Sequence, residues 1–213
     1  MRKVVSQLKM QDRELVCKDR SGKYRPVFKK QGSLDGACAT YSVIMDLLIL
    51  GAIYEADTHI YAEHKNRTTR KLFKVFCNDY GMHREGQTFF KITRMLNESF
   101  SNVIYPEHRL TKDWASVECI VESIQNDTPV IISVQNSSFA HAMLAIGYES
   151  ENGVPNKILC LDPDGDYIHR KKRWNAEIVL CEGKKTTTYR SSNEGLPYEC
   201  KVQLDDIIII TKN

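Results

Sequence analysis

The sequence predicts an α+β fold in which a helical lobe comes before an antiparallel sheet lobe. In several segments between residues 38 and 124, apolar residues recur at every third or fourth position, as on one face of a helix. After Pro129, short runs of branched apolar residues alternate with turn-forming segments, as in antiparallel strands. We therefore expect one domain over residues 1–213, with a helical lobe at about 30–128 and a sheet lobe at about 129–213.

The composition is that of an ordinary globular protein. Of the 213 residues, 27% are charged and 42% are hydrophobic. A chain of this size buries roughly 70% of its unfolded surface on folding, which is enough for one sizeable core. The 30 Lys and Arg residues against 27 Asp and Glu leave a net charge of +3, which is too small to indicate nucleic-acid binding by itself.

The first half of the chain should contain short strands and then helices. Three strands are expected at residues 4–8, 14–17 and 24–28. The clearest helix follows Asp35-Gly36, since its apolar positions up to Ala52 lie on one face and Gly51 is a suitable stop. Apolar residues at the same spacing predict three further helices, at residues 72–80, 89–100 and 114–124.

The second half should form an antiparallel sheet. Five short runs rich in branched residues predict strands, at residues 130–134, 142–148, 157–161, 178–181 and 207–210. The turn-forming segment Glu151-Asn-Gly153 joins the second and third of these runs. We therefore expect them to pair as a hairpin, so that the residue after position 161 returns to the end where the strand at 142 begins.

Cysteine usage and hydropathy indicate where the protein resides. The seven cysteines include no C-x-x-C pair, which fits neither a disulfide framework nor a zinc ribbon. The N-terminus is charged where a signal peptide needs an apolar run, and the longest apolar stretch, residues 43–53, is far below the roughly 20 residues of a membrane span. We expect a cytoplasmic protein with free thiols and no membrane partner, while export by a route that reads no cleavable signal stays open.

Cys38 is the candidate nucleophile. It begins the first amphipathic helix, where free backbone N–H groups and the helix dipole stabilise a thiolate over a thiol. Gly36 allows a sharp turn into the helix and leaves space beside the sulfur. The alternative is a packed structural cysteine, which is the role that we expect for the other six.

His141 is the candidate partner of that thiol. A thiolate nucleophile needs a base or an imidazolium within hydrogen-bond reach. His141 stands at the mouth of the apolar run 142–148, where it would be partly desolvated at the rim of the core. The other histidines lie in polar segments and are expected to be exposed: His59, His64, His83, His108 and His169. A satisfied core histidine is the alternative for His141.

Asp162 is the candidate residue that orients His141. It ends the buried-strand pattern at residues 159–161, and the expected hairpin brings it to the end where His141 lies. The alternative is an aspartate that only initiates the turn Pro163-Asp-Gly165.

Neither a metal ion nor a cofactor is expected. The separations between Cys38, His141 and Asp162 match no zinc pattern. The segment from Asp162 to Asp166 is similar to a calcium loop, but Tyr167 and Arg173 stand where an EF-hand needs Gly and Glu.

Two basic runs, residues 64–71 and 169–174, are interpreted as solvated faces. The alternative is a nucleic-acid-binding module in which these cations hold phosphates while Trp174 and Tyr167 stack on bases. Neither run fits a named nucleic-acid-binding motif, so we do not favour a nucleic-acid partner.

The candidate residues and their neighbours resemble the papain-like cysteine peptidases, and more closely the bacterial branch that includes the leader peptidases of bacteriocin exporters. The similarity lies in Gln31-Gly-Ser33, Gly36-Ala-Cys38, His141-Ala-Met-Leu-Ala-Ile-Gly-Tyr148 and Leu161-Asp-Pro163. The order of Cys, His and Asp, and the helical lobe before the sheet lobe, also match that superfamily.

This resemblance implies a papain-like fold with the active site between the two lobes and a polypeptide substrate. It implies Cys38 as nucleophile, His141 as base and acid, Asp162 as the residue that orients His141, and Gln31 as an oxyanion donor. Such a site forms a thioester, and the second nucleophile decides between a peptidase, a deamidase and an acyltransferase. The alternative is a catalytically inactive member of the superfamily that binds peptides in its cleft.

Overall fold

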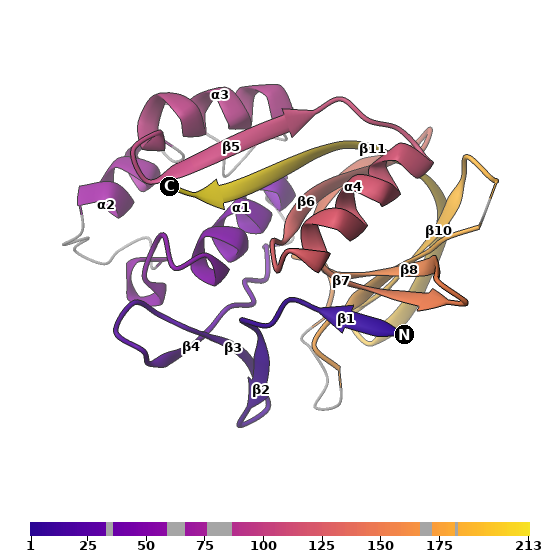
Figure 1. Ribbon diagram of the computed structural model, residues 1–213, viewed down its shortest axis with the longest axis horizontal. Helices are drawn as coiled ribbons and strands as arrows, with labels where there is room; N and C mark the ends of the chain where they lie inside the picture. The colour runs from indigo at the N-terminus through magenta and orange to yellow at the C-terminus, as the bar shows by residue number, and fades with distance from the viewer. Residues whose placement is uncertain (33–35, 59–66, 76–86, 167–171, 182) are drawn as a thin grey trace.

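The computed structural model describes residues 1–32, 36–58, 67–75, 87–166, 172–181 and 183–213 (Figure 1). Its helices are α1 (Cys38–Ile49), α2 (Arg67–Phe73), α3 (Phe89–Phe100) and α4 (Trp114–Gln125), with a 3-10 helix at Glu55–Thr58. Its strands are β1 (Arg2–Val4), β2 (Lys9–Gln11), β3 (Glu14–Lys18), β4 (Tyr24–Pro26), β5 (Ile104–Arg109), β6 (Val130–Gln135), β7 (Ala140–Glu151), β8 (Val154–Leu161), β9 (Ala176–Val179), β10 (Thr187–Asn193) and β11 (Leu196–Lys212).

The larger sheet is antiparallel and closes on itself. Strands β7, β6, β11, β10, β9 and β8 pair in that order, and β8 also pairs with β7. β1 adds to β7 and β5 adds to β11 outside this ring. β2, β3 and β4 form a separate small sheet near the N-terminus. Closure removes most free strand edges from the ring, because nearly every strand has a partner on each side.

Helix α1 packs against β7 and β6 (Figure 1). Its first residue, Cys38, lies beside the start of β7, where it contacts Ala142. Most of α1 is buried, since apolar residues such as Val43, Met45 and Leu47 join the core. α4 covers β7 and β11, and α3 lies against β5. The α+β class expected from the sequence is therefore correct.

The predicted helices are largely confirmed. α1 ends before Gly51, which has a left-handed backbone (φ 64°) that suits glycine. Thr88 caps α3 by accepting a hydrogen bond from the Lys91 N–H at 3.4 Å. The helix expected at 72–80 begins earlier, as α2, and its residues 76–80 lie outside the described part of the chain. Among the described helices, none has the length and apolar character to cross a membrane.

The predicted hairpin is confirmed, because β7 and β8 pair antiparallel with Leu144 opposite Leu161. Three strands were not expected, namely β2, β5 and β10, and β11 begins well before residue 207. The strand expected at residues 4–8 is wrong, because β1 ends at Val4 and the chain turns before β2 begins at Lys9. β5 contains Pro106 and charged residues, and β10 reads Thr-Thr-Tyr-Arg-Ser-Ser-Asn. Both segments lack the apolar runs that predict strands, and they are strands because their neighbours supply hydrogen-bonding partners.

Candidate active site

Cys38 is the first residue of α1 and lies partly buried at the N-terminus of the helix. Its Sγ accepts a hydrogen bond from the backbone N–H of Ala142 at 3.4 Å. Burial by itself raises the pKa of the thiol, but hydrogen bonding to His141 and the charge of that ring, with the N–H groups of Ala142 and Ala39, lower it below its ordinary value. These surroundings favour the thiolate.

His141 lies at the second position of β7 and pairs with Val134 of β6. Its Nε2 is 2.7 Å from Oδ1 of Asp162, which leaves Nδ1 as the ring nitrogen for Cys38. Desolvation lowers the pKa of the imidazole, but the hydrogen bonds and the negative charges of Asp162 and Cys38 outweigh it and raise the pKa. The ring is therefore favoured as an imidazolium between two anions.

Asp162 follows the last residue of β8 and is completely buried. Oδ1 faces His141 and accepts the Asp164 N–H at 3.0 Å. Oδ2 accepts hydrogen bonds from the Tyr189 hydroxyl and from Ser191 Oγ, the latter at 2.9 Å. Burial raises the pKa of this carboxyl, yet these donors and the charge of His141 lower it below its ordinary value, so Asp162 stays ionised.

The backbone of Asp162 is held by a second set of contacts. Its N–H donates to Oδ1 of Asn175 at 2.7 Å, and its C=O accepts from Nδ2 of the same amide at 2.8 Å. Nδ2 also donates to the C=O of Asp166 at 2.9 Å. Asn175 therefore fixes both ends of the turn that begins at Asp162.

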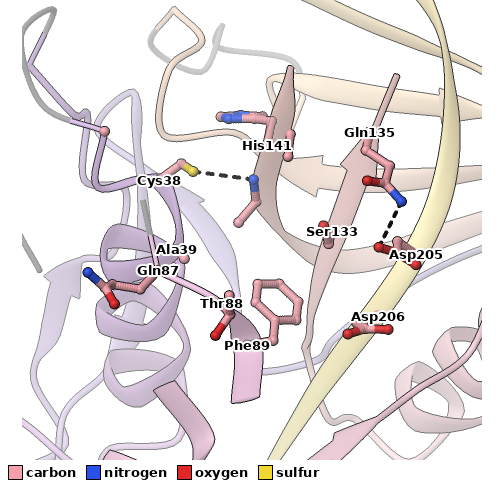
Figure 2. Close-up of a pocket in the computed structure, with 13 residues that line it drawn as sticks. Cys38, Ala39, Gln87, Thr88, Phe89, Ser133, Gln135, His141, Asp205 and Asp206 are labelled. Atoms are coloured by element: carbon pink, nitrogen blue, oxygen red, sulfur yellow. Dashed lines mark hydrogen bonds between the residues drawn. The ribbon is translucent and has the colours of Figure 1, made fainter. Parts of the chain in front are cut away.

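A cavity of about 420 Å³ opens beside Cys38 and His141. Figure 2 shows Cys38 on the α1 side and, across from it, Asp205 and Asp206 of β11. Gln135 donates from Nε2 to Oδ2 of Asp205 at 2.9 Å. The remaining lining residues lie at the start of α1, at the start of α3, and on β6 and β7. They are Gly36, Ala39, Gln87, Thr88, Phe89, Ser133, Ala140 and Ala142.

Gln31 lies away from this lining, next to the turn after Asp162. Its backbone N–H donates to the C=O of Pro163 at 2.8 Å, and its Nε2 donates to Oδ1 of Asp164 at 3.3 Å. The chain segment that leads to Cys38 is thus tied to the loop that carries Asp162. Gln31 is not among the described residues that line the cavity.

Other expectations from the sequence have mixed outcomes. His108, expected to be exposed, has a side chain only 11% exposed and lies 2.9 Å from Asp206. Trp174 is buried, donates to Glu177 and lies under Arg2, so its ring is not available to stack on a base. Several predictions fall outside the described residues, namely those for Cys77, His59, His64, His83, Tyr167 and His169. Among the described residues, no group of three or more potential ligands could hold a metal ion.

The site contains residues that sequence reasoning missed: Tyr189, Ser191 and Asn175. Tyr189 and Ser191 are two positions apart on β10, so they face the same side of the strand. That spacing is the only sequence signal for them, and it is hidden because the strand itself reads as a polar loop. Asn175 sits between Trp174 and β9 with no local pattern that marks it.

A comparison with protein-family models identifies the family of this chain. The model of the Peptidase_C39 like family matches residues 24–190, which include Cys38, His141 and Asp162. No curated protein gives a significant match. The match confirms the resemblance to papain-like cysteine peptidases, and the C39 name fits the branch of bacteriocin leader peptidases. Because the family model covers most of its length, this chain belongs to the Peptidase_C39 like family.

Proposed function

We propose that this protein is a cysteine peptidase that cleaves a polypeptide through a thioester on Cys38. The observation that carries the proposal is that Cys38 and the hydrogen-bonded pair of His141 and buried Asp162 lie beside one cavity, with the Cys38 sulfur bonded to the backbone N–H that follows His141. A nucleophile, a base and a group that orients the base are the three parts that this chemistry requires.

In the proposed reaction, the Cys38 thiolate attacks the carbonyl carbon of a peptide bond, and the C–N bond then breaks. The His141 imidazolium donates its proton to the departing amine, which leaves a thioester on the sulfur and a neutral imidazole. Neutral His141 next takes a proton from water, and the hydroxide attacks the thioester. The product acid leaves, the thiolate is restored, and His141 is again protonated. Asp162 keeps the ring oriented and its charge stabilises the imidazolium at each stage.

The oxyanion that forms on the carbonyl needs hydrogen-bond donors. In our proposal, these are the backbone N–H of Cys38, at the start of α1, and the side-chain amide of Gln31. Asp164 accepts a hydrogen bond from the Gln31 amide, which has two N–H groups, so the proposal requires that the other N–H reach the oxyanion. Loss of one such donor typically costs about 3 kcal/mol of transition-state stabilisation.

We further propose that residues 1–213 form one papain-like domain whose helical lobe, at about 30–128, and sheet lobe, at about 129–213, flank the active site. The two sides of the cavity support this proposal, because α1 and the entrance to α3 line one side and β6, β7 and β11 line the other. A polypeptide would then bind across the cavity between the lobes.

A labelling experiment tests the proposal without knowledge of the substrate. The protein is treated near neutral pH with limiting iodoacetamide, and the modified cysteines are mapped by mass spectrometry. We expect Cys38 to react first and His141→Ala to abolish that preference. Cys119 on α4 is a suitable internal control because it is also only partly buried. Labelling of Cys119 at the same rate as Cys38 would contradict the proposal.

Activity is then measured on a peptide mixture. Cys38→Ala should abolish cleavage, whereas Cys119→Ala should retain it. Cys38→Ser should be nearly inactive, because a hydroxyl is far less ionised than a thiol beside the same imidazole. Release of ammonia or transfer to an added amine, with no new peptide ends, would indicate a deamidase or an acyltransferase in place of a peptidase.

A further inference from the structure

The Asp162 carboxylate has more hydrogen bonds than the single one needed to orient a histidine ring. Its side chain is completely buried, and four hydrogen bonds reach its two oxygens. An ionised carboxylate in such a place is strongly destabilised unless donors compensate for the lost water. Two of the donors are hydroxyls of β10, namely those of Tyr189 and Ser191, and both reach Oδ2, the oxygen that does not face His141.

We propose that Tyr189 and Ser191 are positioning residues of the active site. The inference rests on the proposed function, since it concerns how Asp162 serves His141. The two hydroxyls hold Oδ2, which turns Oδ1 toward Nε2 of His141 and keeps the carboxylate ionised. The ring is thereby held with its other nitrogen toward Cys38. No part of Tyr189 or Ser191 needs to touch the substrate.

The packing around Ser191 leaves the carboxylate little freedom to turn. A Cβ atom on Gly165 would lie 2.8 Å from Ser191 Oγ, 2.8 Å from Asn175 Nδ2 and 3.3 Å from Asp162 Oδ2. These are closer than ordinary contacts to three polar groups of the same network. Only glycine therefore allows the turn after Asp162 to lie against β10.

The tip of the β10–β11 hairpin is also fixed to this turn. Asp166 accepts the N–H groups of Glu194 and Gly195, each at 2.9 Å, and its own N–H donates to the C=O of Ser192 at 2.8 Å. Lys30 lies 3.6 Å from the same carboxylate. The β10–β11 hairpin is therefore bound to the turn at two places: its tip contacts Asp166, and Tyr189 and Ser191 of β10 contact Asp162. Two such contacts make the hairpin a rigid support for the Asp162 carboxylate.

The test compares Tyr189→Phe, Ser191→Ala and the double variant with wild type, and Tyr198→Phe is the matched control. Tyr198 lies on β11, packs edge-on against Tyr189 at 5.7 Å between ring centroids, and is 45% exposed. Its substitution removes the same atom without touching Asp162. The pH dependence of peptide cleavage and of Cys38 alkylation is measured for each variant.

We expect each substitution at Tyr189 or Ser191 to raise the pKa of Asp162, because the ionised form loses a donor. A carboxylate that is harder to ionise stabilises the His141 imidazolium less, so the thiolate–imidazolium pair with Cys38 forms only at a higher pH. The acid limb of kcat/KM should move up by roughly one pH unit for Tyr189→Phe and further for the double variant. Turnover at neutral pH should fall roughly tenfold, with KM little changed. Ser191→Thr, which keeps the hydroxyl, should behave like wild type.

An unmoved acid limb in both single variants would overturn the inference, as would an equal shift in Tyr198→Phe. If Tyr189→Phe fails to fold, Ser191→Ala and Ser191→Thr decide the question. Failure of the proposed function has a different signature, because wild type itself would then lack cleavage activity and Cys38 would titrate as an ordinary thiol. That result would overturn both proposals.

Discussion

The two buried aspartates Asp46 and Asp162 have equally little exposure to solvent but opposite electrostatic surroundings. Both side chains have no exposed surface. Asp162, at the end of β8, has donors on both oxygens and its pKa is lowered. Asp46, inside α1, has no hydrogen-bond partner for either oxygen among the described residues, and burial raises its pKa well above the ordinary value.

The comparison of Asp46 with Asp162 shows that burial alone does not determine whether a carboxyl group is ionised. Removal from water disfavours the ionised form of both carboxyls, but only Asp162 has a network that restores its stability. Asp162 is therefore an anion available to stabilise His141, whereas burial of Asp46 disfavours its charged form and is a cost to the core. Burial alone therefore does not indicate which aspartate would serve the proposed chemistry.

The largest expected effect is the loss of activity in Asp162→Asn. The amide has nearly the same shape but no charge, so the imidazolium loses its partner. Turnover should fall by roughly 10²- to 10⁴-fold in a cleavage assay. Asp46→Asn is the matched control and should keep wild-type turnover. If the two variants lose activity equally, the distinction between the two carboxyls is wrong.

The next effect concerns the thiol. His141→Ala removes the ring whose hydrogen bond and charge lower the pKa of Cys38, so the pH profile of Cys38 alkylation should shift upward. Wild type should show a bell-shaped activity profile, in which the acid limb reports formation of the thiolate–imidazolium pair and the alkaline limb reports loss of the imidazolium proton. An alkylation profile that is identical in wild type and His141→Ala would mean that the apo protein holds no such pair.

A smaller effect is expected on stability from Asp46. Because its pKa is higher in the folded protein, the folded state favours the protonated form. Its contribution to stability is fully present below about pH 4, the unfolded value, and is lost as pH rises toward the raised folded pKa. Asp46→Leu should therefore increase the free energy of unfolding at pH 7 by about 1–3 kcal/mol. Asp46→Asn, which cannot ionise, should remove this part of the pH dependence.

Chemical denaturation at several pH values measures both variants. The difference in unfolding free energy between wild type and Asp46→Asn should change across that pH range. A constant difference would show that Asp46 does not titrate on unfolding as its surroundings require.

The smallest effects are expected at Asp164 and Asp166, the neighbours of Asp162 in the turn. Asp164→Ala removes the acceptor for the Gln31 amide, and Asp166→Ala removes the anchor of the hairpin tip. Neither side chain bonds to His141 in the described contacts, so turnover should fall less than tenfold in each variant. Losses as large as that of Asp162→Asn would point to the turn as a structural or cation-binding unit.

Local sequence was enough to predict part of the fold and the candidate residues. α3 has a regular apolar face, α1 is an apolar segment that is buried almost throughout, and β6, β7 and β8 have short apolar runs rich in branched residues, which favour strands. The turn at Gly153 fixes the β7–β8 hairpin, and this pairing is why Asp162 could be placed near His141. These features depend on residues that are close in the chain, so their pattern is visible without the structure.

The rest depends on contacts between distant segments. β5 and β10 have no strand pattern of their own and are strands because β11 offers them hydrogen bonds. Closure of the sheet depends on the pairing of β11 with β6, two strands that are far apart in sequence. The polar neighbours of His108 in the sequence predict an exposed side chain. In the structure, the pairing of β5 with β11 places Asp206 within hydrogen-bond distance of His108.

By itself the sequence determined the family, the α+β class and the identity of Cys38, His141 and Asp162 as candidates. Helix starts, strand ends and short turns are local, and so are the motifs around these residues. Only the tertiary structure decided that Tyr189, Ser191 and Asn175 surround Asp162, and that no residue in the described ranges donates to Asp46. The ionisation of a buried carboxyl depends on which groups from other segments lie within about 3 Å of it. No pattern along one segment of the chain contains that information.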